Sequence, residues 1–273
     1  MKHNDAFELI VAQAPSVTWS VSVRKNGQEI VGLNSQISLP TASVGKVFLL
    51  IAAARALSTG THSATDRLTL IGEDRVGDSG IWQYLSEPSM SFESACVLVA
   101  SVSDNCAANV LLRELGLNAV HLESTSRDMP ETLMCDQIRD IRLPSDPPAP
   151  SMSRTCDLTL LMAEIAHIRK TNDYLAIVET WLSLNTDLSM VASAFSLDPL
   201  AHSGVINGMS FFNKTGTDIG VRADAGNFVI DGTSWSYAVT AHWPDGDSTQ
   251  IGSVLHAMRE CGKALWQLAQ TRN

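Results

Sequence analysis

Ser43 and Lys46 are the first residues of this chain whose types and spacing suggest covalent chemistry. A helix that begins here would place both side chains on one face, because they are three residues apart. The first turn of a helix also presents unpaired N–H groups and about half a positive charge. Burial can lower the pKa of a lysine from about 10.4 toward neutrality, and the neutral amine can then take a proton from a hydroxyl. Ser43 is therefore a candidate nucleophile, and Lys46 is its candidate base.

The same pair also allows a purely structural interpretation. A serine can cap a helix start, and a lysine there can extend its amine to water. About one Ser-x-x-Lys is expected by chance in a chain of this length. Taken alone, the spacing therefore favours the structural interpretation.

The element that must position this pair is the stretch that follows it. Residues 47–54 are all apolar, which predicts a helix that starts at Ser43, lies buried in the middle of the domain and ends near Gly60. Before it, the pattern predicts a helix over 5–14 and a hairpin over 17–33 that turns at Asn26-Gly27. After it, the pattern predicts helices over 92–102, 106–115, 155–167, 173–184 and 248–269, and strands at 211–212, 226–230 and 234–243.

Two regions are hard to assign. Residues 61–93 show no clear pattern, and the prolines near the end of 118–154 predict an ordered surface loop there. The simplest packing of the assigned elements is a sheet whose strands come from both chain ends, with a helical part inserted. We expect a single domain with lobes 1–40 plus 206–273 (sheet and terminal helices) and 41–205 (helical).

Composition narrows the class of protein. The 273 residues are 45% hydrophobic and 18% charged, as in soluble globular proteins. A formal charge of −10 argues against nucleic acid and anionic membranes as partners. The acidic residues near the N-terminus and the odd count of five cysteines lead us to expect a cytoplasmic protein. The seven histidines lack metal-ligand spacing, so we expect no metal and no cofactor, and we favour a monomer.

Two further motifs follow the first in a fixed order. Ser103-Asp104-Asn105 breaks two predicted helices, and Lys214-Thr215-Gly216 lies on a predicted strand. With Ser43-Val44-Gly45-Lys46, this set resembles the S-x-x-K, S-D-N and K-T-G signature of the class A β-lactamases and penicillin-binding proteins. The resemblance covers nearly the whole chain. It implies an α/β (α+β) fold: a three-layer αβα sandwich with an antiparallel sheet built from both chain ends, plus an inserted all-α lobe.

The resemblance also implies roles for the matching residues. Ser43 would be acylated, Lys46 would take or relay its proton, and Ser103 would pass a proton to the leaving atom. Asn105 would bind the substrate's amide side chain and help to hold Lys46. Lys214, with Thr215, would supply positive charge and a hydroxyl contact for a substrate carboxylate, and Gly216 would also belong to the substrate-binding residues. The oxyanion hole would come from the backbone N–H groups of Ser43 and Thr217.

Two more residues are candidates for substrate contact, each with a structural alternative. Arg222, eight residues after Lys214, could reach a substrate carboxylate or be a solvated strand residue. Trp82 could form a wall of the cleft or lie at the edge of the core.

One part of the family pattern is missing. Class A enzymes carry a loop glutamate that activates the deacylating water, within an E-x-x-L-N pattern that this chain does not reproduce. If Met129-Pro130-Glu131 is the counterpart, the base has become Met129. Otherwise Asp140 is the nearest acid, and its neighbours Arg139 and Arg142 favour a role in holding the loop, since an ion-paired aspartate is a poorer base.

Two classes of function therefore follow. The first is a serine hydrolase that forms an acyl-enzyme at Ser43 with a β-lactam, amide or ester. Its substrate would be a small molecule with a carbonyl and a carboxylate, and deacylation would take a non-standard route. The second is a non-hydrolytic penicillin-binding or sensor module that is acylated stably or not at all.

Overall fold

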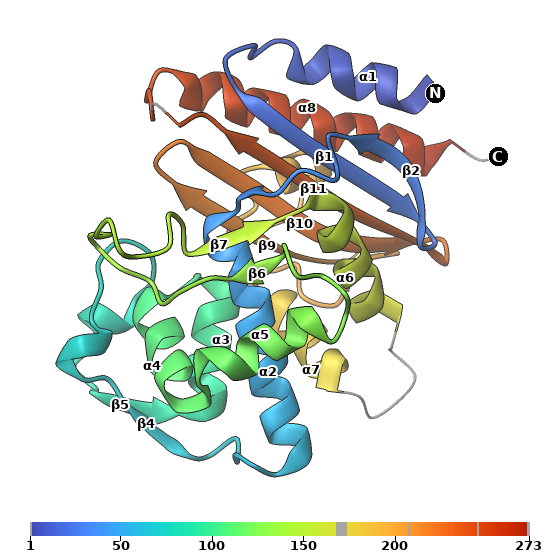
Figure 1. Cartoon of the computed structure of the whole chain (residues 1–273). Coiled ribbons are helices and arrows are strands. Elements are labelled where there is room, and N and C mark those ends of the chain that lie inside the picture. The colour runs from blue at the N-terminus through green and yellow to red at the C-terminus, as the bar shows by residue number, and fades with distance from the viewer. Residues whose placement is uncertain (1, 168–173, 207, 245, 272–273) are drawn as a thin grey trace.

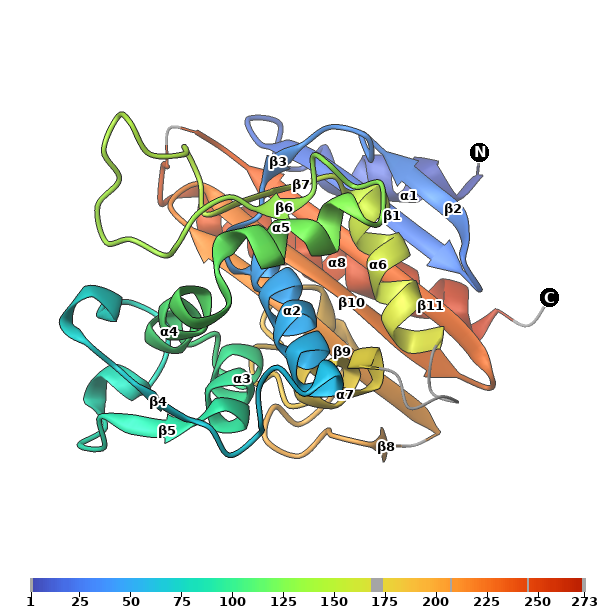
Figure 2. The same cartoon turned by 60° about the horizontal axis from the view of Figure 1, so that its bottom comes forward.

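The computed structural model describes residues 2–167, 174–206, 208–244 and 246–271. Within these residues, six strands form an antiparallel sheet in the order β2-β1-β11-β10-β9-β8 (Figures 1 and 2). Their bounds are β1 Thr18–Lys25, β2 Gln28–Leu33, β8 Val205–Ile206, β9 Met209–Asp218, β10 Val221–Ile230 and β11 Thr233–His242. Because β1 pairs with β11, the sheet is built from both chain ends, as predicted.

Helices cover both faces of the sheet. On one face lie α1 (Lys2–Val11) and α8 (Gln250–Gln270), and on the other lies α6 (Thr155–His167) (Figure 1). Strand β1 shows why: Val21 packs in the same core as α1 and α8, whereas its neighbour Ser20 hydrogen-bonds Thr155 of α6 at 2.7 Å. Successive side chains of a strand point to opposite faces of the sheet. Val21 therefore faces the apolar core under α1 and α8, while Ser20 faces the hydroxyl groups of α6.

The central helix α2 (Lys46–Thr59) is buried along most of its length, as its apolar sequence predicts. It ends at Gly60, whose φ of 73° closes the helix in the left-handed conformation. By length and composition, residues 42–59 could cross a membrane, but most of this segment is buried inside the protein. The predicted start at Ser43 is refined: residues 42–45 form a 3₁₀ turn, and the α-helix begins at Lys46.

Four helices pack around α2: α3 Phe92–Ser101, α4 Asn105–Leu115, α5 Leu117–Thr125 and α7 Tyr174–Leu182 (Figure 2). With the sheet and its covering helices, they confirm the predicted mixed α/β class with an antiparallel sheet. The lobe boundaries at 40 and 205 stay a prediction. The predicted start of the last of these helices, Asp173, lies outside the described residues.

The prediction of an irregular stretch over residues 118–154 was wrong in part. Helix α5 covers residues 118–125 of it, and β6 (Leu133–Met134) and β7 (Ser151–Ser153) form a small sheet with β3 (Leu39–Pro40). Elements this short carry too few periodic positions to be recognised from sequence. Residues 61–93 similarly hold two short paired strands, β4 (Arg67–Thr69) and β5 (Ser89–Ser91). The stretch between β6 and β7 remains a loop, as the prolines require.

Candidate active site

The 3₁₀ turn that carries Ser43 is held from two sides. On one side, Ser151 Oγ of β7 donates a hydrogen bond to Ala42 O at 2.5 Å. Ala42 has a φ of 48°, an unfavourable value for a residue with a Cβ, so the surrounding contacts must maintain it. On the other side, a Cβ added at Gly216 of β9 would collide with the Thr41 carbonyl. The chain therefore needs glycine at 216 so that β9 can lie directly against the turn with the half-buried Ser43.

Lys46 lies one residue beyond this turn and is only 1% exposed. Its Nζ donates to Ser103 O and to Asn105 Oδ1, each at 2.6 Å, and lies 3.3 Å from Ser103 Oγ. The first two partners are acceptors only, so a neutral amine can satisfy both with its two N–H bonds and keep its lone pair for a proton.

The electrostatic surroundings favour that neutral form. Burial lowers the pKa of Lys46 well below its usual value, and the nearby charge of Lys214 lowers it further. Asp104 and Asp78 act in the opposite direction but do not reverse the shift. The environment of Lys46 is therefore compatible with the predicted role of its amine as a proton acceptor.

Ser103 connects the two lysines. Its Oγ lies 3.3 Å from Lys46 Nζ and 3.0 Å from Lys214 Nζ. Its φ of 55° places it in the left-handed region, at the break between α3 and α4. The next residue, Asp104, caps α4 through the Ala107 N–H at 2.9 Å, so the break is fixed by the helix that follows it.

Asp104 also attaches a second loop to this segment. Its Oδ2 accepts hydrogen bonds from the N–H groups of Ile81 and Trp82 at 2.7 and 2.8 Å. A Cβ at Gly80 would collide with Asp104, so this approach also requires glycine. Asp104 therefore positions the loop 77–84 beside Ser103 and Asn105. No separate role for Asp104 was predicted from the sequence.

Lys214 is fully buried on β9, where its Nζ also donates to Thr215 O at 2.8 Å. Burial lowers its pKa to about 8, while the negative charges of Asp187 and Asp224 limit the shift. Lys214 is therefore mostly a cation at neutral pH, whereas the surroundings of Lys46 shift that amine toward its neutral form. The two lysines have different environments although they share Ser103.

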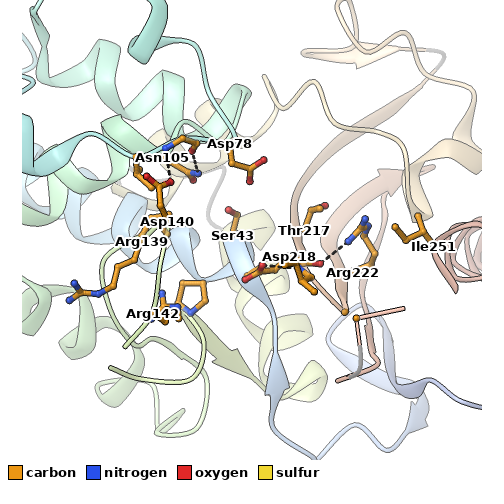
Figure 3. Close-up of a pocket in the computed structure, with 18 of the residues that line it drawn as sticks. Ser43, Asp78, Asn105, Arg139, Asp140, Arg142, Thr217, Asp218, Arg222 and Ile251 are labelled. Atoms are coloured by element: carbon orange, nitrogen blue, oxygen red, sulfur yellow. Dashed lines mark hydrogen bonds between the residues drawn. The ribbon is translucent and has the colours of Figure 1, made fainter. Parts of the chain in front are cut away.

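Two cavities meet at Ser43. The larger, about 490 Å³, runs from Asp140 to Ile251 (Figure 3). The smaller, about 230 Å³, lies on the side of Ser103 and Thr215. Ser43 and Thr217 line both, so a molecule that spans the two would pass over the Ser43 hydroxyl.

The structure places the remaining predicted residues as follows. Asn105 lines the larger cavity, and its Nδ2 donates to Gly77 O at 3.1 Å. Arg222 stands opposite Thr217 in the sheet and lines the same cavity, with its guanidinium 5.9 Å from the centre of the Trp243 ring. Its Nη1 donates to Asp218 O and Val221 O at 2.9 and 2.7 Å, and Ile251 lies beside it (Figure 3).

The prediction that Trp82 forms a wall of the cleft was wrong. Its side chain is fully buried in the core around α2, and its Nε1 donates to Glu87 O at 3.1 Å. Its contribution to the site is its backbone N–H, which binds Asp104. An indole whose N–H has a hydrogen-bond partner inside the protein is stable in a core. Trp82 is therefore a core residue, in line with the second of the two interpretations offered for it.

The loop between β6 and β7 also differs from expectation. Arg139 and Arg142 pair with Asp136, at 2.7 and 3.1 Å, and not with Asp140. Asp140 instead lines the larger cavity, and its Oδ1 accepts a hydrogen bond from the backbone N–H of Gly77, another lining residue, at 2.8 Å (Figure 3). Met129 is buried in the core, so it does not face the reactive residues.

Known proteins resemble this chain over nearly its whole length. A model of the β-lactamase enzyme family matches residues 4–269. The chain belongs to the β-lactamase enzyme family. No curated protein sequence matches this member of the family.

Solved structures show the same fold at low sequence identity. The β-lactamase of Sphaerobacter thermophilus superposes with a TM-score of 0.83 at 21% identity, covering 97% of each chain. An ancestral class A β-lactamase gives 0.80 at 18%, covering 97% of this chain and 99% of its own. The L158E mutant of PBP-A, solved as an acyl-enzyme complex with penicillin G, gives 0.81 at 18%, covering 98% and 96%. This β-lactamase family member therefore has the class A β-lactamase fold that the motifs predicted.

Acidic residues in and behind the smaller cavity were not predicted from the sequence. Asp187 lines it, and the fully buried Asp224 lies behind it, where Asn213 Nδ2 and the Tyr237 hydroxyl donate to its Oδ1 at 2.9 and 3.1 Å. Burial raises the pKa of Asp224 to about 7. These residues match no short motif. The only sequence signal was that Asn213 directly precedes Lys214.

Proposed function

We propose that this protein is a serine hydrolase that forms an acyl-enzyme at Ser43 with a β-lactam, amide or ester. The observation that carries the proposal is the connected chain Lys46–Ser103–Lys214, which joins an amine of lowered pKa, a hydroxyl and a cation, and whose central residue Ser103 lines the same small cavity as Ser43.

In the acylation step, Ser43 Oγ attacks the substrate carbonyl and its proton goes to Lys46. The bond from the carbonyl carbon to the leaving nitrogen or oxygen then breaks, and Ser103 gives its proton to the leaving atom. Lys46 returns a proton to Ser103, so the proton balance closes within the site. Backbone N–H groups of Ser43 and Thr217 stabilise the oxyanion, a contribution of about 3 kcal/mol for each donor in comparable sites.

Substrate contacts divide between the two cavities. Lys214 and Thr215 bind a carboxylate beside the smaller cavity, where the leaving group lies. The acyl side chain occupies the larger cavity along Asn105 and Thr217, and Arg222 adds positive charge at its far side. Water then releases the acyl group by a route that does not use the family's loop glutamate.

The test is the intact mass of the protein after exposure to a penicillin, a cephalosporin and an activated ester. A transient adduct with turnover supports the hydrolase. A stable adduct identifies a penicillin-binding or sensor module, and no adduct with any compound contradicts the proposal. Ser43→Ala must abolish every adduct, while Ser193→Ala, on the 3₁₀ turn Val191–Phe195, serves as a matched control.

A further inference from the structure

The smaller cavity beside Ser43 has an unusual lining. Its side chains are almost all hydroxyls and amides: Ser79, Ser101, Ser103, Asn185, Thr186, Thr215 and Thr217. Among the described residues that line it, Asp187 carries the single carboxylate. A lining of this kind suits a polar or charged fragment, because an apolar group would leave these hydrogen-bonding groups without partners.

Asp187 is held in place by its neighbours. Its backbone N–H donates to Asn185 Oδ1 at 3.3 Å, and its carbonyl accepts from Asn185 Nδ2 at 3.2 Å. Ser189 donates to Asp187 Oδ1 twice, from its N–H at 3.1 Å and from its hydroxyl at 2.6 Å. Within the described part of the chain, both of these bonds end on Oδ1, so Oδ2 keeps its capacity to accept from a ligand.

The charge of Asp187 acts on both cations of the site. It opposes the lowering of the pKa of Lys214 and of Arg222, which burial causes in each case. A substrate carboxylate at Lys214 therefore approaches a negative charge as well as a positive one. A leaving group that carries only a carboxylate meets repulsion here, whereas one that also carries an ammonium group is neutralised on both sides.

We propose that Asp187 determines leaving-group specificity: it selects amides or esters whose leaving group carries an ammonium group near its carboxylate. The carboxylate binds Lys214 and Thr215, and the ammonium binds Asp187 Oδ2. This inference rests on the proposed function, because it requires the leaving group to occupy the cavity beside Ser103.

Matched acyl-amino acids test it, with the same acyl group and a leaving residue with or without a terminal amine. Suitable pairs are lysine with norleucine and 2,4-diaminobutyrate with 2-aminobutyrate, each in D and L form. For at least one pair, wild-type kcat/KM should be about two- to fivefold higher for the amine-bearing member, the effect of one partly exposed ion pair. Asp187→Asn, which keeps the size of the side chain, should remove this preference.

Asp231→Asn is the control, since it removes one exposed charge at the β10–β11 turn and should keep the preference. Equal rates within every pair, or a preference that survives Asp187→Asn, would overturn the inference. The inference is also overturned if penicillin acylates Ser43 but no acyl-amino acid is cleaved. That outcome would not contradict the proposed acylation at Ser43. Failure of every compound to acylate Ser43 would instead refute the proposed function itself.

Discussion

The surroundings of Lys46 and the loop around Asp140 both lie close to Ser43, but they are held in different ways. Lys46, Ser103 and Lys214 are joined by hydrogen bonds of 2.6 to 3.3 Å between two secondary-structure elements and the break before α4, and both lysines are buried. Asp140 reaches the opposite wall through one hydrogen bond, while its neighbouring arginines pair with Asp136.

This difference separates the two halves of the proposed reaction. The groups needed for acylation are fixed and have environments that set their protonation. The loop residues near the site hold each other and the cavity wall, and Asp140 already uses one carboxylate oxygen on Gly77. We therefore expect substitutions around Lys46 to affect acylation strongly, and substitutions in the loop to affect it little.

The largest effect is expected for Lys46→Met. The variant removes the base but retains an unbranched side chain in the buried position, so acylation should slow by roughly 10²- to 10⁴-fold. The rate of adduct formation by mass spectrometry measures it, with Lys263→Met on the exposed side of α8 as the control. If Lys46→Met is acylated at the wild-type rate, Lys46 is not the base for acylation, and its surroundings matter no more to this step than the loop around Asp140.

A pH profile gives the next largest effect. Lys214 has a pKa of about 8, so its positive charge is present below that pH and is lost above it. For a substrate with a carboxylate, kcat/KM should fall about tenfold per pH unit above about 8. A matched substrate without the carboxylate should lack this decrease. If both substrates give the same profile, Lys214 does not bind the carboxylate.

The smallest effect is expected in the loop. Asp140→Asn keeps an acceptor for Gly77 N but removes the negative charge, so hydrolysis of a preformed acyl-enzyme should change by less than about threefold. Asp140→Ala also removes the hydrogen bond and should lower the free energy of unfolding by about 1 kcal/mol. Single-turnover deacylation and denaturant unfolding measure the two effects. A hundredfold slower deacylation in Asp140→Asn would identify Asp140 as the group that activates water.

The sequence predicted best what depends on local pattern. The apolar run after Lys46 identified the central helix, Asn26-Gly27 identified the hairpin turn, and the three motifs identified the fold. Short elements were missed because a strand of two or three residues, such as β6 or β7, has no readable period. Trp82 was misplaced because its hydrogen-bond partner, Glu87 O, is a backbone atom that no motif marks.

Asp187 and Asp224 illustrate a different limit. Their importance comes from their distance to Lys214, which is set by tertiary packing and not by position in the chain. The same is true of Arg139 and Arg142, which lie one and two residues from Asp140 in the sequence but pair with Asp136. Sequence neighbours of a charged group are therefore weak evidence for its ionic partners.

The pairing of β1 with β11 has a consequence for biosynthesis. Thr18 lies opposite His242, so the N-terminal hairpin emerges from the ribosome long before its partner strand exists. Until then the hydrogen-bonding edge of β1 is open, and such edges favour association with other chains. Lys214 is also synthesised long after Ser43, so a nascent chain contains Ser43 before the buried lysine of β9 is present. Chains that end before Thr233 lack β11, so they should leave this edge exposed and associate more readily than the full chain.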